Sequence, residues 1–211
     1  MIPDKKLFTA KEWKLVERLN TPAKVQRFFS RMPYCWESHG TRSFREVVKR
    51  GEAHCLEAAV GAATILEQHG YPPLLLDLES HDLLDHVIYV FKDNGRWGSI
   101  ARSRDIGLNG RKPVFRSLRD LAWSYFDTYV DFSGRLKGYA VTSLYELGNY
   151  DWRFSPRKMT KIEDHLRAIP HKPMRSSDAR YEKLLARYHK YKQRYPDRSP
   201  SYHDSRPNWM L

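Results

Sequence analysis

The chain has only two cysteines and no long hydrophobic run, and both absences narrow its class. Two cysteines allow one disulfide at most, so a disulfide-rich secreted fold is excluded and we expect Cys35 and Cys55 to be free thiols. No apolar run approaches the roughly 18 residues of a membrane span, and the opening MIPDKKLFTAKEW lacks the apolar core of a secretory signal. We therefore expect a soluble cytoplasmic protein with no membrane contact.

Metal-ligand spacing is also missing. The segments HKPM and YHKY each contribute a single histidine, and no cysteine lies at zinc-finger spacing from them, so we expect no metal and no cofactor. Asp77 and Glu79 flank the end of an expected strand, and no second carboxylate lies at a spacing that implies acid–base work.

What the chain has in excess is positive charge. Its net charge is +12, and residues 156–211, with 14 Lys and Arg against 6 Asp and Glu, hold +8 of it. The length fits one domain with an appendage. We therefore expect a domain over residues 1–155, followed over 156–211 by a basic helical extension that ends in a flexible tail.

Capping signals predict most of the helices. The pairs Thr9–Glu12 and Thr21–Pro22 should start two helices, and Ser43–Glu46 should start a third that stops at Gly51. Helices are also expected over 117–130, after a Thr160–Glu163 box, and over 178–195.

The central helix should run from about Cys55 to Gly70. Its sequence, CLEAAVGAATILEQHG, is apolar nearly all round and rich in alanine, which indicates a buried helix that its neighbours approach closely. The runs LLLDL and VIYVF should follow as strands, and Asn94-Gly95 should form a tight hairpin back into RWGSIA. GYAVTSLY is a further candidate strand. The order predicts an α+β fold: helices first, then a small antiparallel sheet packed on the 55–70 helix.

A two-residue Asn94-Gly95 loop fixes the hairpin register, because opposing residue numbers then sum to 189. Val90 should face Ser99 and, if both strands persist, His86 should face Ser103. Since Ile88 and Val90 share a face with His86, we expect that face to lie against the Cys55 helix. Asp105 would then lie diagonally from the imidazole.

This arrangement indicates a thiol enzyme. A cysteine in the first turn of a helix has its thiolate favoured by the helix dipole, and a histidine at the head of a neighbouring strand can take its proton. Cys55 and His86 are thus the candidate nucleophile and base, with Asp105, or alternatively Ser103, orienting the imidazole. His54, Trp36 and Trp97 are candidates for the cleft lining. Buried cysteines are also commonly inert, so the residues alone leave that alternative open.

The stretch GEAHCLEAAVGAATILEQHGYPPLLLDL, followed by DHVIYVFKDNGRWGSIA, resembles the core of the transglutaminase-like superfamily, which belongs to the papain-like cysteine enzymes and includes uncharacterised bacterial members. The resemblance covers roughly residues 40–110. It implies a papain-like core in which Cys55 and His86 act on a peptide or another amide substrate, by hydrolysis or by acyl transfer. The family commonly has an aspartate four residues after the hairpin tryptophan, where this chain has Ala101. The third position is therefore filled by Asp105 or Ser103, or a dyad suffices, or the site is inactive.

A second hypothesis uses the basic helix expected over 178–195. Its lysines and arginines alternate with four tyrosines, a composition suited to phosphate contacts and base stacking. The chain would then be an inactive transglutaminase-like binding module that engages nucleic acid or an acidic partner. Alternatively, the helix docks on the main domain through an apolar stripe that comprises Tyr181, Leu184, Leu185 and Tyr188.

Overall fold

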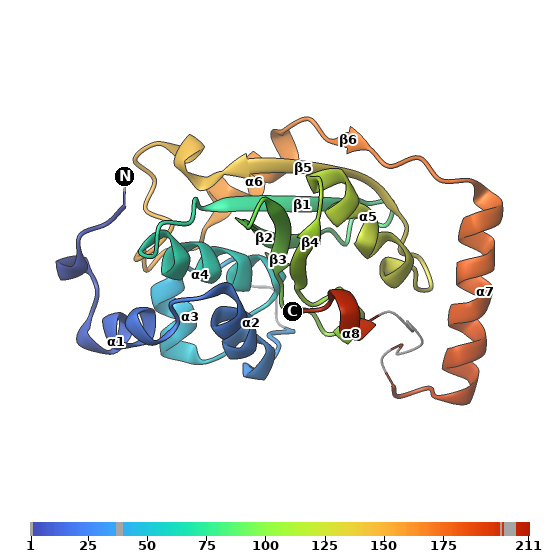
Figure 1. Ribbon diagram of the computed structural model, residues 1–211, viewed down its shortest axis with the longest axis horizontal. Coiled ribbons are helices and arrows are strands. Elements are labelled where there is room, and N and C mark those ends of the chain that lie inside the picture. Colours follow the sequence, from blue (N-terminus) through green and yellow to red (C-terminus); the bar gives the residue numbers. More distant parts are fainter. Residues whose placement is uncertain (1, 37–39, 199, 201–205) are drawn as a thin grey trace.

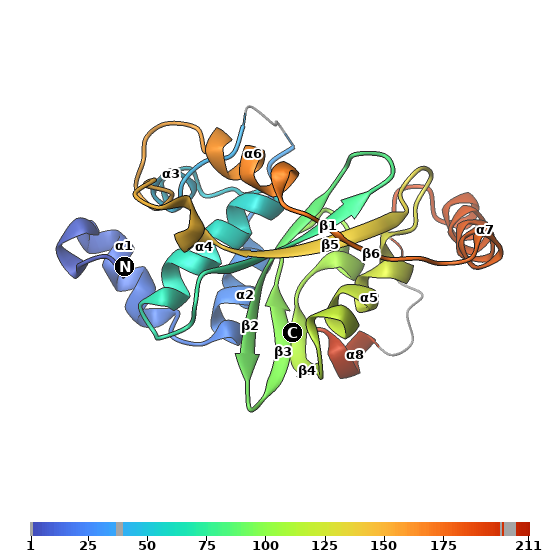
Figure 2. The same ribbon diagram turned by 90° about the horizontal axis from the view of Figure 1, so that it is seen from above.

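The computed structural model describes residues 2–36, 40–198, 200 and 206–211. The described residues form an α+β fold with one six-stranded antiparallel sheet and helices on both of its faces (Figures 1 and 2). The strand order is β4-β3-β2-β1-β5-β6, so β4 and β6 are the edge strands. The predicted α+β class and the packing of a central helix on the sheet are confirmed; no described helix is long and apolar enough to cross a membrane.

The elements have the following bounds. The strands are β1 (Leu74–Ser80), β2 (His86–Asp93), β3 (Arg96–Ile100), β4 (Arg111–Phe115), β5 (Leu136–Ser143) and β6 (Lys172–Pro173). The α-helices are α1 (Ala10–Arg18), α2 (Pro22–Arg31), α3 (Phe44–Arg50), α4 (Cys55–Glu67), α5 (Leu118–Tyr129), α6 (Thr160–Ala168), α7 (Asp178–Arg194) and α8 (Arg206–Trp209). Short 3-10 turns lie at η1 (Lys5–Leu7), η2 (Ile106–Leu108) and η3 (Leu144–Leu147).

Local signals set most of these boundaries. The side chains of Thr9, Thr21 and Ser43 each accept a hydrogen bond from the backbone three residues on, as N-caps do. Helix α3 ends at Gly51, whose φ of 76° a residue with a side chain rarely adopts. The Thr160–Glu163 box does not form: Glu163 instead accepts hydrogen bonds from Thr41, 122 residues away in the sequence.

The hairpin register is confirmed where the strands persist. Val90 lies opposite Ser99, and the turn residue Asn94 has a φ of 46°, which a two-residue hairpin turn requires. Strand β3 ends at Ile100, however. The predicted pairing of His86 with Ser103 is therefore wrong, because the chain leaves the sheet before reaching Ser103.

The sheet separates two hydrophobic cores, and helices cover each face (Figure 2). Helices α2, α3 and α4 lie on one face with the odd-numbered β2 residues Val87, Tyr89 and Phe91. Helix α5 lies on the other face with Ile88 and Val90. Residues 86–91 are consequently all buried, and successive side chains of this part of β2 enter two different interiors.

The segment beyond residue 155 joins both interiors. Met159, Ile162 and Leu166 are buried in the α4 core, and Met174 is buried in the α5 core. Strand β6 pairs with β5, so the first part of the predicted extension is integral to the fold.

Part of the expected flexible tail, residues 199 and 201–205, lies outside the described residues. The last residues return to the sheet: Arg111 stacks between Tyr125 and Trp209, and the Leu211 N–H donates to the Gly110 carbonyl.

Helix α2 approaches α4 closely at Gly61. A Cβ on Gly61 would lie 2.6 Å from Cζ of the buried Phe29 on α2, closer than two carbons can be packed. Absence of a side chain at Gly61 therefore sets the distance between α2 and α4.

We predict that Gly61→Ala lowers the free energy of unfolding by roughly 1–2 kcal/mol, because overpacking outweighs the gain in helix propensity. Urea denaturation measures this change. The penalty should shrink in a Phe29→Leu background, which removes the contacting atom; an equal penalty in both backgrounds would contradict the packing explanation.

Candidate active site

Cys55 is the first residue of α4, and it is half-buried. The helix starts here because His54 has an extended backbone and its N–H donates to Glu57 Oε2 at 3.1 Å. His54 is thus the N-cap of the helix, a structural position beside the thiol.

A buried ion pair holds this first turn in place. The Arg42 Nε and Nη2 atoms donate to the two carboxylate oxygens of Glu57 at 2.6 and 2.8 Å, and the Arg42 N–H adds a third bond at 2.9 Å. A matching pair, Arg153 with Glu67, holds the last residue of the helix. Both carboxylates are saturated with donors, but the balance with burial differs: the bonds from Arg42 hold the pKa of Glu57 below its ordinary value, whereas burial raises the pKa of Glu67 despite Arg153.

The thiol itself is not a preformed thiolate. Burial raises the pKa of Cys55, and the negative charge of Asp77 raises it further. The backbone amides of Val87 and Leu56 oppose the rise without reversing it. A reaction at this sulfur therefore needs a base that takes the proton.

A candidate for that base is Asp77, at the centre of β1, whose charge acts on the thiol. Asp77 lies directly opposite Val87 of β2 and Ala140 of β5, so all three side chains are on the α4 face of the sheet. Its carboxylate accepts a hydrogen bond from His171 Nε2, or is paired with it as an ion pair, at 3.0 Å. The Asp77 side chain is only 4% exposed.

Small residues on β5 make room for this pairing. His171 immediately precedes β6, whose Lys172 lies opposite Tyr139. A Cβ on Gly138 would lie 3.1 Å from the His171 Cβ, and Ala140 adds only a methyl group. The imidazole can therefore lie over β5 and reach the Asp77 carboxylate on the next strand.

One oxygen of this carboxylate is unsatisfied. Among the described residues, Asp77 Oδ1 is the buried side-chain polar atom that has no hydrogen-bond partner. Burial raises the pKa of Asp77 to about 6, which the hydrogen bond from His171 only partly offsets. A carboxyl group with such a pKa, whose charge acts on a thiol at a helix N-terminus, has the features of an acid–base group.

His86 lies on the opposite face of the sheet from Cys55. The prediction that His86 is the base for this thiol is therefore wrong. The His86 Nε2 is 2.9 Å from the Leu108 carbonyl oxygen, and its ring lies 5.9 Å from that of Tyr125 on α5. Burial lowers the pKa of His86 to about 4, so the ring is neutral at pH 7. It fills a place in the α5 core, and the sheet separates it from the sulfur.

The predicted third members do not orient His86. Ser103 is buried in the loop after β3, where its hydroxyl accepts from the Asp105 N–H at 3.2 Å. Asp105 occupies the N-cap position of η2 without a side-chain capping bond, and its Oδ2 lies 3.7 Å from Arg104 Nε. Neither residue is opposite His86 in the sheet, because β3 has already ended.

The two tryptophans also differ from the prediction of a shared cleft. Trp97 packs at the edge of the α5 core, on the far side of the sheet from Cys55. Trp36 is 71% exposed and stacks edge-to-face on Tyr34. Tyr34 is the aromatic residue near the thiol: burial and the charge of Cys55 raise its pKa to about 12.

Sequence reasoning missed Asp77 and His171, which are 94 residues apart. A single carboxylate inside the apolar run LLLDL was the available signal, since a charge on a buried strand needs a partner. The partner itself gave no signal, because His171 stands alone in its segment.

Among the described residues, no three His, Cys, Asp or Glu side chains gather as metal ligands. No known family model matches the chain, and no curated protein is significantly similar to it.

We predict that Asp77→Asn stabilises the protein at pH 8. The folded-state pKa of about 6 exceeds the ordinary value of 3.8, so the folded protein holds this proton more tightly and loses stability as pH rises through about 6. Removing the charge should raise the free energy of unfolding by up to about 3 kcal/mol at pH 8. Thermal denaturation at pH 5 and pH 8 measures the difference in stability between the Asp77→Asn variant and the unaltered protein, and this gain should be smaller at pH 5. The prediction would be contradicted if Asp77→Asn destabilised the protein more at pH 8 than at pH 5.

Proposed function

We propose that this protein is a cysteine-nucleophile amide hydrolase or acyl transferase in which Asp77, held by His171, is the proton acceptor for Cys55. The observation that carries the proposal is the buried, unpartnered Asp77 Oδ1 close to a helix-start thiol. The other buried carboxylates among the described residues, Glu12, Glu57 and Glu67, each accept hydrogen bonds from an arginine on both oxygens, whereas Asp77 keeps one oxygen without a partner.

The proposed reaction uses the protonation states that the site favours at neutral pH. Asp77, with a pKa of about 6, is ionised and takes the Cys55 proton as the sulfur attacks an amide carbonyl carbon. Backbone N–H groups at the start of α4 stabilise the resulting oxyanion. Collapse of this intermediate breaks the C–N bond, and the amine leaves with the proton from Asp77. Water or an acceptor amine then cleaves the thioester and returns the sulfur to its thiol form.

The resemblance to the transglutaminase-like superfamily supports the same nucleophile but a different base. Its order of a cysteine at a helix start followed by antiparallel strands agrees with the α4–β1–β2 arrangement. Membership in that superfamily remains part of the proposal. The substrate class, a peptide or another amide, also comes from this resemblance.

The test is the pH dependence of Cys55 alkylation in a Cys35→Ser background, where a single thiol reports. The rate with iodoacetamide should fall as pH drops through about 6, because Asp77 becomes protonated. Asp77→Asn should remove this step and slow alkylation near pH 7 by roughly 10²-fold, the lower range for a lost general base. Mass spectrometry of Cys55 after incubation with a peptide-amide pool then detects the acyl adduct.

His86→Gln and His171→Gln form a matched pair of controls. The His171→Gln variant should move the pH at which the alkylation rate falls, because His171 contacts Asp77. The His86→Gln variant should leave the pH profile unchanged, because that ring is on the other face of the sheet. A profile that depends on His86 and not on Asp77 would refute the proposed base. In the protein that retains both cysteines, an acyl adduct that forms at Cys35 as readily as at Cys55 would refute the proposed nucleophile.

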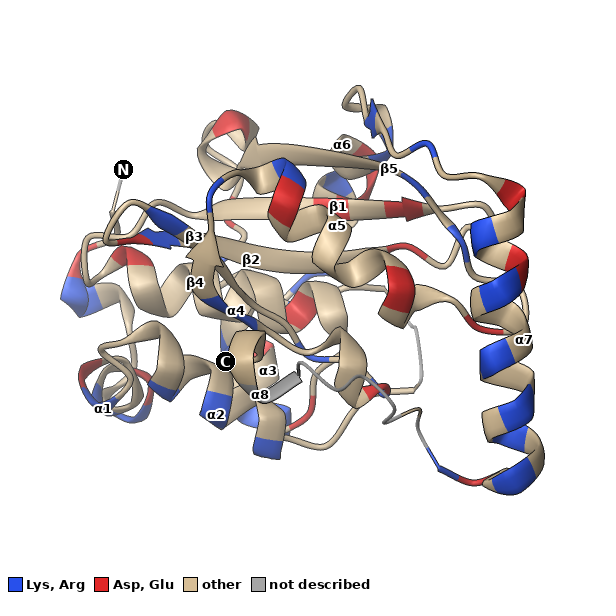
Figure 3. Cartoon of the chain, turned by 45° about the vertical axis from the view of Figure 1, so that its right-hand side comes forward, with Lys and Arg blue, Asp and Glu red and all other residues tan. Residues whose placement is uncertain are grey.

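A second candidate function, binding of a polyanion by α7, is favoured by the exposed basic face of that helix (Figure 3). Lys183, Arg187 and Lys190 lie together on it, beside Leu184. Helix α7 also docks on the domain, since Arg135 stacks on Tyr181 and Phe132 packs edge-to-face on the buried Tyr188. Docking therefore occupies two of the tyrosines that base stacking would use.

For this candidate we predict that Lys183→Glu/Lys190→Glu weakens binding of a single-stranded oligonucleotide and lowers the slope of affinity against salt by about 2. Fluorescence anisotropy at several salt concentrations measures both. Unchanged affinity and slope would rule out α7 as a polyanion site.

A further inference from the structure

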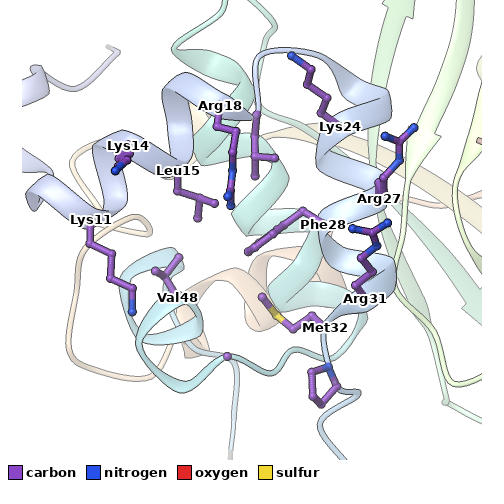
Figure 4. Close-up of a pocket in the computed structure, with 13 residues that line it drawn as sticks. Lys11, Lys14, Leu15, Arg18, Lys24, Arg27, Phe28, Arg31, Met32 and Val48 are labelled. Atoms are coloured by element: carbon purple, nitrogen blue, oxygen red, sulfur yellow. The ribbon is translucent and has the colours of Figure 1, made fainter.

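The first helices enclose a groove of about 910 Å³ (Figure 4). Its walls are α1 and α2, and residues at the end of α3 close it. The floor is apolar and consists of Leu15, Leu19, Phe28, Met32 and Val48. Leu15, Phe28 and Val48 are only half-buried, so the floor presents apolar surface to any occupant.

Two rows of cations border this floor. Lys11, Lys14 and Arg18 line the groove from α1, and Lys24, Arg27 and Arg31 line it from α2. Both rows have spacings of three and then four residues, which keep each row on one side of its helix. All six side chains are exposed. Each row extends about 10 Å along its helix axis, or two turns.

The acidic residues of these helices face elsewhere. Glu12 of α1 is buried against Arg45, with its Oε1 2.8 Å from Arg45 Nε, and Glu17 accepts a hydrogen bond from Trp13 Nε1. Helix α2 contains no acidic residue. Across the described ranges, no carboxylate forms an ion pair with any of the six groove cations. Their mutual repulsion is therefore not offset within the groove.

We infer that the groove bounded by α1, α2 and α3 binds an amphipathic helix of a partner protein that carries acidic residues on both sides of an apolar stripe. The apolar floor fits side chains spaced at three and four residues, and the two cation rows fit carboxylates on both flanks of that stripe. This binding surface is separate from the chemistry proposed at Cys55.

Other anionic occupants match fewer of these features. A fatty acid has one carboxylate, whereas the cations form two rows of three. Single-stranded nucleic acid requires aromatic faces for its bases, and the floor offers one aromatic ring, Phe28. A membrane surface is flat, whereas the apolar residues lie at the bottom of a concavity.

The test uses a labelled synthetic peptide of about five helical turns, with leucines along one stripe and glutamates on both flanks. It should bind the full-length protein, and a peptide with glutamines in place of the glutamates should bind much more weakly. Lys14→Glu/Arg27→Glu should weaken binding of the acidic peptide at least about tenfold. Val48→Asp, which puts a negative charge on the floor, should do the same.

The chain offers a matched control for each change. Lys183→Glu/Lys190→Glu on α7 alters the net charge equally, and Val114→Asp alters an exposed valine on β4; both should retain peptide binding. Equal binding of the glutamine peptide, or an equal loss in the α7 variant, would overturn the inference. The inference would also be overturned if the protein bound a fatty acid or anionic vesicles but not the peptide, and if the groove variants Lys14→Glu/Arg27→Glu and Val48→Asp weakened that binding. If analytical ultracentrifugation showed that the protein is a dimer and that Lys14→Glu/Arg27→Glu makes it monomeric, the occupant of the groove would be a second copy of this chain and the inference would be overturned.

Discussion

Helices cover both faces of the two central strands, and this double burial constrains every other feature of the molecule. Consecutive side chains on β1 and β2 enter different interiors, so a change of one in residue number moves a group from the α4 side to the α5 side. Val87 and Asp77 therefore belong with Cys55. His86, next to Val87 in the chain, belongs with Tyr125 and Leu108.

The described residues include four buried carboxylates, Glu12, Glu57, Glu67 and Asp77, and Asp77 differs from the other three in its partners. Glu57 and Glu67, at the two ends of α4, each pair with an arginine through both oxygens, and these bonds fix the ends of the helix. One carboxylate oxygen of Asp77, Oδ2, contacts His171 Nε2, and the other, Oδ1, has no hydrogen-bond partner. An unsatisfied buried carboxylate destabilises a fold, and such costs are commonly found where chemistry requires a reactive group. The proposed role of Asp77 follows from this contrast.

Features that depend on neighbouring residues were predictable from the sequence, and features that depend on distant ones were not. The N-caps at Thr9, Thr21 and Ser43 and the Asn94-Gly95 hairpin are local, and the structure confirms them. The face of β2 was not predictable, because VIYVF is apolar at both alternate sets of positions and either set can lie against α4. Strands β4 and β6 were missed since both are short and each contains a proline. The Asp77–His171 pair joins segments that no local pattern connects.

Both edge strands of the sheet contain a Lys-Pro pair, and this pair affects how readily the protein aggregates at high concentration. Edge strand β4 contains Lys112-Pro113, and edge strand β6 is Lys172-Pro173. A proline has no amide hydrogen to offer an incoming strand, and an adjacent lysine charge repels a second copy of the same edge. Neither border can therefore present an unbroken row of donors to another molecule, so the sheet is protected at both ends against growth by intermolecular strand addition, the first step of amyloid-type aggregation.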